Sequence, residues 1–108
     1  MVLKSFRDLR VWKEGMDLVK AVYQVVSSFP KHEVYGLSSQ MRRAVVSVPS
    51  NIAEGYARQH RKEYLNHLSI AQASLAELDT QLEIAARLEY LTPESAAELQ
   101  QRVESLSK

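Results

Sequence analysis

Apolar residues recur at intervals of three and four along most of the chain, which is the period of an α-helix. The clearest run begins near His60 or Arg61 and ends near Leu88; its apolar positions are Tyr64, Leu68, Ala71, Leu75, Leu78, Leu82 and Ala85. An unbroken alternation of four and three is typical of helices that pack lengthwise in bundles or coiled coils. The pattern therefore predicts a third helix roughly 40 Å long.

The first predicted helix, residues 6–28 with Asp8 near its start, carries two apolar stripes instead of one. One stripe is Leu9, Trp12, Met16, Val19, Tyr23 and Val26, and the other is Val11, Leu18, Val22, Val25 and Phe29. Because a small bundle has a single interior, two stripes predict a helix covered twice, by the bundle core and by a second subunit. A single wide core-facing surface is the alternative.

The second predicted helix, residues 37–54, carries a proline in its interior. Its apolar face is Leu37, Met41, Ala44, Val45, Val48 and Ile52. Ser38 or Ser39 is a suitable N-cap. Pro49 has no backbone N–H and its ring crowds the preceding turn, so we expect a kink there, with Ser47 or Ser50 bonding the freed backbone groups. Gly55 suits the left-handed residue that follows a helix end.

The last predicted helix, residues 93–106, has the clearest start of the four. Thr92 is a good N-cap, Pro93 fits the first helical position, and Glu94 complements the helix dipole in the first turn. Short connections between consecutive helices imply antiparallel neighbours. We therefore expect residues 1–108 to form one all-α domain, an up-down-up-down four-helix bundle with a long third helix and a second helix kinked at Pro49.

The composition excludes several classes of protein. Hydrophobic residues make up 45% and charged residues 25% of the 108 positions, as in ordinary globular proteins. The chain has no cysteine, which excludes disulfides and thiolate chemistry. It shows neither a charged-then-apolar leader nor an apolar run of about 18 residues, so we expect a cytoplasmic protein without a membrane span.

Catalytic patterns are weak in this sequence. A di-metal bundle needs a Glu-x-x-His pair on two helices, and no glutamate here precedes a histidine by three residues. We expect the histidines, His32, His60 and His67, to be surface residues. No nucleophile elbow or glycine-rich phosphate loop occurs. Four acids are expected to be solvated or to pair with Arg42 and Arg43; they are Glu54, Glu77, Asp79 and Glu83. The prediction is a non-enzyme that binds no cofactor and no metal.

Charge is unevenly distributed although the net charge is only +1. Residues 36–63 carry five Lys/Arg against two Asp/Glu, whereas residues 64–90 carry one against four. Arginine and lysine hold phosphate oxygens. The candidate nucleic-acid contacts are Arg42, Arg43, Arg58, Arg61 and Lys62, with His60 nearby and Tyr56 and Tyr64 able to stack on bases. A solvated basic loop with no ligand is the alternative.

Several short segments carry a family resemblance. They are Phe29-Pro30, Tyr35-Gly36-Leu37, Gln-Met-Arg-Arg-Ala at 40–44, Val-Ser-Val-Pro-Ser-Asn-Ile-Ala-Glu-Gly at 46–55 and Ser-Leu-Ala-Glu-Leu-Asp-Thr-Gln-Leu at 74–82. Together they resemble the bacterial proteins encoded in 23S rRNA intervening sequences, also called the S23 ribosomal protein family. The resemblance implies a ring-like homopentamer of four-helix bundles. A related branch, the accessory variability proteins of retroelements, is strongly basic and binds nucleic acid and a reverse transcriptase.

The central motif of this resemblance is Pro49, Ser50, Asn51, Glu54 and Gly55. We interpret Asn51 and Glu54 as structural residues that bridge the kink and the start of the third helix, with a ligand site as the alternative. Two functional hypotheses follow for the whole chain. The first is an oligomeric binder of structured RNA or other nucleic acid, and the second is a scaffold that docks a protein such as a reverse transcriptase.

Overall fold

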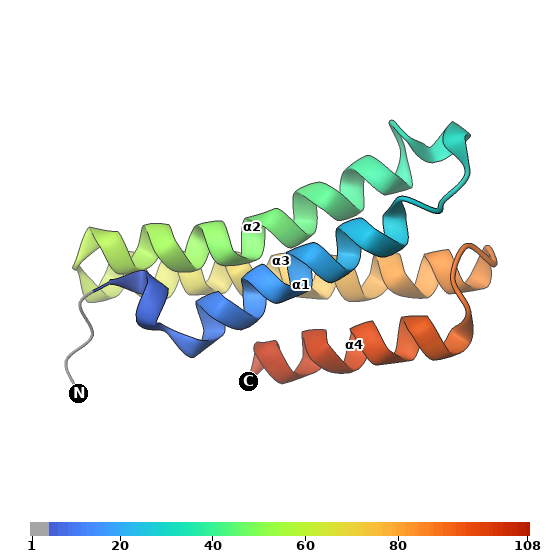
Figure 1. Cartoon of the computed structure of the whole chain (residues 1–108). Coiled ribbons are helices and arrows are strands. Elements are labelled where there is room, and N and C mark those ends of the chain that lie inside the picture. Colours follow the sequence, from blue (N-terminus) through green and yellow to red (C-terminus); the bar gives the residue numbers. More distant parts are fainter. Residues whose placement is uncertain (1–4) are drawn as a thin grey trace.

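The chain folds into an all-α four-helix bundle, as the apolar periodicity predicts. The computed structural model describes residues 5–108, and within them the α-helices are α1 (Arg10–Val26), α2 (Leu37–Arg58), α3 (Arg61–Arg87) and α4 (Pro93–Ser107). Two short 3₁₀ helices, η1 (Phe6–Asp8) and η2 (Lys31–Glu33), precede α1 and α2. Figure 1 shows successive helices running in opposite directions, with their connections at alternate ends.

The core follows the predicted α3 stripe only where all four helices are present. Its largest fully buried side chains are Leu18, Val22, Met41, Val45, Val48, Leu78, Leu82 and Val103. At the start of α3, Tyr64 and Leu68 are only half-buried. The reason is that α4 is much shorter than α3: the amide of Gln72 donates to the carbonyl of Ser107, near the end of α4, at 2.9 Å. Figure 1 shows α4 ending well short of the α2–α3 turn.

The first helix begins later than predicted. Ser5 and Asp8 form a capping box around η1, in which the Arg7 N–H donates to the Ser5 hydroxyl and the Ser5 N–H donates to the Asp8 carboxylate. Leu9 then adopts an extended conformation, with φ −74° and ψ 128°, before α1 starts at Arg10. Residues 6–28 are therefore not one helix, because the cap closes a single turn and the backbone straightens after it.

The two apolar stripes of α1 differ in how much of their surface is buried. Leu18, Val22 and Phe29 of the second stripe are buried in the core. In the first stripe, Met16 and Tyr23 are each 44% exposed. A single chain therefore leaves part of the apolar surface of α1 uncovered.

The second helix ends later than predicted, and Gly55 does not terminate it. α2 continues through Gly55 to Arg58, and Gln59 adopts the left-handed conformation with φ 60°. Gly55 is a buried residue where α2 meets α3: a Cβ added to it would lie 2.8 Å from the Cβ of His67 and 3.0 Å from Cδ1 of Tyr64. Glycine is needed here for the close approach of two helices rather than for a turn.

The start of α2 is also capped differently from the prediction. Neither Ser38 nor Ser39 is the cap, because the N-cap position belongs to Gly36. A carboxylate oxygen of Glu33 accepts the Leu37 N–H at 3.0 Å instead. The other oxygen of Glu33 accepts the Tyr90 hydroxyl at 2.8 Å, which ties the α1–α2 loop to the α3–α4 loop. These bonds hold the pKa of Glu33 below its ordinary value and raise the pKa of Tyr90.

α4 starts as predicted. The Thr92 hydroxyl accepts the Ser95 N–H at 3.1 Å, and Pro93 occupies the first helical position. Pro49 lies inside α2, which is continuous on both sides of it. The kink at Pro49 remains a prediction.

Two glycine substitutions should act in opposite directions. Gly55→Ala should destabilise the fold by about 1–3 kcal/mol, because the new methyl group overlaps His67 and Tyr64. Gly15→Ala is the matched control: its Cβ would meet Pro49 at an ordinary 3.5 Å, and alanine favours a helix interior by about 1 kcal/mol. Thermal unfolding at one protein concentration should show a lower Tm for the first variant and an unchanged or higher Tm for the second. Equal shifts in both variants would contradict this packing.

The Glu33 carboxylate should make stability depend on pH. A carboxyl group whose pKa is lower in the folded state stabilises the fold above its ordinary pKa, and this stabilisation is lost as the pH falls through the lowered value. Glu33→Gln should therefore lower the Tm at neutral pH. In a series of buffers of decreasing pH below 4.5, the difference in Tm between the variant and wild type should become progressively smaller. Thermal scans of both proteins across that series test this. A difference that stays constant down the series would show that the charge of Glu33 is not involved.

Candidate nucleic-acid interface

Three of the five predicted basic residues meet at the α2–α3 turn, together with His60. Arg58 is the last residue of α2, Arg61 is the first residue of α3, and His60 and Lys62 flank Arg61. All four side chains are exposed, and none forms an ion pair with any residue between 5 and 108. We call this group the basic turn. The left-handed Gln59 and the extended His60 make the connection short, so the two helix ends and their cations stay together.

Arg42 and Arg43 do not belong to the basic turn. Arg58 lies 16 positions after Arg42 on the same helix, which is about 24 Å at 1.5 Å per residue. Figure 1 shows the start of α2 at the opposite end of the bundle from the α2–α3 turn. Arg42 donates to the carbonyl of Val34 at 3.3 Å, and Arg43 is exposed. The five candidate cations therefore form two separate groups.

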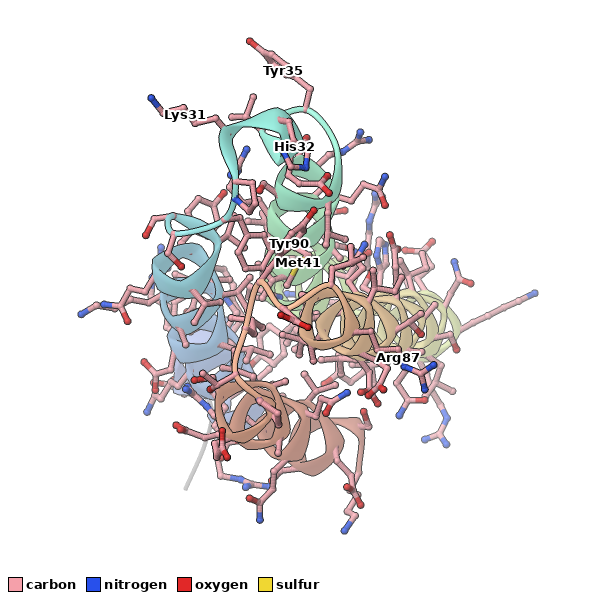
Figure 2. All side chains as sticks on the ribbon, turned by 90° about the vertical axis from the view of Figure 1, so that its right-hand side faces the viewer. Lys31, His32, Tyr35, Met41, Arg87 and Tyr90 are labelled. Carbon is pink, nitrogen blue, oxygen red and sulfur yellow. The ribbon has the colours of Figure 1, made fainter. Side chains whose placement is uncertain are left out.

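The aromatic residues expected to stack on bases are largely engaged in packing. Tyr64 is half-buried and contacts Gly55, and Tyr56 is also half-buried. Tyr35, which the sequence did not single out for binding, is 95% exposed. Figure 2 shows Tyr35 on the loop before α2, pointing away from the helices.

Asn51 of the central motif belongs to a hydrogen-bonded seam between α2 and α3. The Asn51 amide donates to the carbonyl and hydroxyl oxygens of Ser47, both at 2.9 Å, and its oxygen lies 3.0 Å from Nδ1 of His67. The Ser74 hydroxyl donates to the Ser47 hydroxyl at 2.8 Å. We call these four residues, Ser47, Asn51, His67 and Ser74, the polar seam. Asn51 therefore bridges the two helices as predicted.

Other parts of the motif prediction are wrong. Glu54 is exposed and bonds to none of the described residues, so it does not bridge the helices. His67 is half-buried in the seam rather than a surface residue. The Ser47 hydroxyl accepts from Asn51 and Ser74, and among residues 5–108 neither Ser47 nor Ser50 bonds to the carbonyl that Pro49 frees.

The acidic residues of α3 do not pair with Arg42 or Arg43. Glu77 accepts from the Gln81 amide at 3.0 Å. Glu83 accepts from Arg87 at 3.0 Å and more weakly from Gln100, and these bonds lower the pKa of Glu83. Glu83 and Arg87 are four residues apart on α3, a spacing at which side chains on one helix meet more easily than side chains on two different helices. The sequence spacing alone therefore indicates this ion pair.

Among residues 5–108, no three His, Asp or Glu side chains are placed to hold a metal ion. Within the same part of the chain, none of the helices has the length and apolarity needed to cross a membrane.

Comparisons with known proteins place the chain in a family. A solved structure from Bacteroides thetaiotaomicron, of a protein with unknown function from the S23 ribosomal protein family, superposes with a TM-score of 0.83. It is 22% identical in sequence, over 90% of this chain and 88% of that one, so it supports the fold alone. No curated protein shows a significant sequence match. The model of the 23S rRNA-intervening sequence protein family matches residues 7–108. The chain therefore belongs to the 23S rRNA-intervening sequence protein family.

Proposed function

We propose that this protein is a non-enzymatic, homo-oligomeric nucleic-acid-binding protein that contacts structured RNA through the basic turn. The observation that carries the proposal is the exposure of Arg58, Arg61 and Lys62 at one end of the bundle without an acidic partner among the described residues. An unpaired guanidinium is free to bind phosphate oxygens in a bidentate manner.

The rigidity of the turn supports this proposal. The polar seam and Gly55 fix α2 against α3 within a few residues of the turn. Cations attached to two packed helix ends lose little backbone freedom on binding, unlike cations on a flexible loop. Arg42 and Arg43 lie too far away to contact the same phosphate groups, so we assign them a secondary role on a long RNA.

The salt dependence of RNA binding tests this function. Each phosphate contact contributes about 0.7–0.9 to the slope of log affinity against log salt concentration. Wild-type protein should bind a fluorescent structured RNA at about 50 mM salt and lose affinity steeply toward about 200 mM. The triple variant Arg58→Ala, Arg61→Ala and Lys62→Ala should bind weakly and reduce the slope by about two or more.

A charge-matched control separates the turn from net charge. The variant Lys13→Ala, Lys20→Ala and Arg102→Ala removes the same formal charge from α1 and α4, away from the basic turn. It should bind RNA with nearly the wild-type slope. If wild-type protein shows no binding at low salt, or if both triple variants lose affinity equally, the basic turn is not the RNA site.

A second candidate function, self-assembly into a scaffold, rests on apolar surface that one chain leaves open. On the α1–α2 side, Tyr23 and Val46 are 44% and 39% exposed and border one hollow with Arg42 and Arg43. On α3, Ile70 and Ile84 are 42% and 41% exposed. We call these the α1–α2 face and the α3 face.

The two faces are suited to each other. No Lys or Arg occurs between residues 64 and 86, and the exposed Glu77 lies midway between Ile70 and Ile84 on α3. A cationic apolar face and an acidic apolar face on one molecule favour head-to-tail contacts, which form a ring when the rotation between successive subunits closes. We propose such a ring, with the five subunits that the family resemblance implies. A protein partner such as a reverse transcriptase would then dock on the assembled ring.

A further inference from the structure

A cavity lies at the end of the bundle opposite the basic turn, between the end of α1, the η2 loop and the start of α2. Its volume is about 370 Å³, within the range of small-molecule pockets. The loop that borders it carries Lys31, and Figure 2 shows this loop projecting beyond the helices. We call it the loop cavity.

Most of the cavity wall is apolar. Val26, the last residue of α1, and Phe29, three residues after it, are buried, and Pro30 and Val34 complete this wall from the loop. Such a wall favours a hydrocarbon or aromatic group over a fully hydrated ion.

The polar lining consists of Ser38 and Arg42 of α2, Lys31 of η2 and Ser27, and its two charged groups are both cationic. Arg42 is half-buried, and its bond to the Val34 carbonyl at 3.3 Å holds the guanidinium beside the cavity. That bond uses one terminal nitrogen, so other N–H groups of Arg42 are available to a ligand. Lys31 is exposed at the rim.

Ser38 provides an independent indication of a ligand. It lines the cavity, is only 3% exposed, and its hydroxyl bonds to none of the residues from 5 to 108. The hydroxyl is not among the fully buried polar atoms that lack a partner, so it is open to the cavity and available to a ligand. Ser38 is also in the first turn of α2, where the helix dipole favours negative charge. The one resident carboxylate there, Glu33, is already bonded to Leu37 and Tyr90.

We propose that the loop cavity binds a small organic carboxylate with a short apolar tail. The carboxylate would accept hydrogen bonds from Arg42 and Ser38, and the tail would lie against Val26, Phe29 and Pro30. This site is independent of the basic turn, so its failure would leave the RNA proposal unaffected.

The test is an NMR titration of the full chain labelled with ¹⁵N, using hexanoate as the probe. Hexanoate should cause saturable shifts at the amides of Lys31, Val34 and Ser38. Hexanol, which lacks the charge, and inorganic phosphate, which lacks the tail, should each shift these amides much less. Equal responses to hexanol or to phosphate, or no saturable shift with hexanoate, would overturn the proposal.

Two neighbouring arginines give a matched pair of variants. Arg42→Gln should weaken hexanoate binding by about tenfold or more, the effect of losing a charge-assisted bond. Arg43→Gln removes the adjacent charge, which does not line this cavity, and should change the affinity less than about twofold. Ser38→Ala removes only one hydroxyl group, so it should disturb the fold less than Arg42→Gln, and it should weaken hexanoate binding severalfold. An equal effect of Arg42→Gln and Arg43→Gln, or no effect of Ser38→Ala, would also overturn the assignment.

Discussion

The close packing of α2 on α3 is the constraint on which the rest of this structure depends. These are the two longest helices, and they share the most extensive contact in the bundle. Gly55 lets Tyr64 and His67 approach the α2 backbone, and the polar seam fixes how the two helices align. This contact holds the two helix ends that carry the basic turn next to each other. The same pairing extends beyond the end of α4, so it also determines which apolar surfaces remain open.

The sequence predicts features of the fold that depend on neighbouring residues. The three-four spacing in α3 and the Thr92-Pro93 start of α4 are local signals, and both are confirmed. The errors concern contacts between distant segments. Gly55 looks like a helix end because glycine serves both turns and close approaches, and only the position of α3 decides between them. The cap on α2 comes from Glu33, outside the helix, so a search for a capping serine misses it.

The same contrast between local signals and distant contacts holds for the candidate functional residues. Arg58, Arg61 and Lys62 lie together because a short turn holds them, whereas the length of α2 separates them from Arg42 and Arg43. The two stripes on α1 indicate more apolar surface than one bundle covers, and the exposure of Met16 and Tyr23 agrees. The loop cavity has no sequence signature, because it depends on how the fold brings Ser38 and Arg42 of α2 beside the end of α1 and the η2 loop.

The mass of the assembly tests most directly whether the two open faces bind each other. Light scattering should give about five times the 12.3 kDa of one chain. Val46→Glu, on the α1–α2 face, and Ile84→Glu, on the α3 face, should each be monomeric, whereas Ala97→Glu on the exposed side of α4 should assemble normally. Mixing the first two variants should yield a dimer that grows no further, because each retains one working face. A wild-type protein that stays monomeric, or a mixture that forms no dimer, would contradict head-to-tail assembly through these faces.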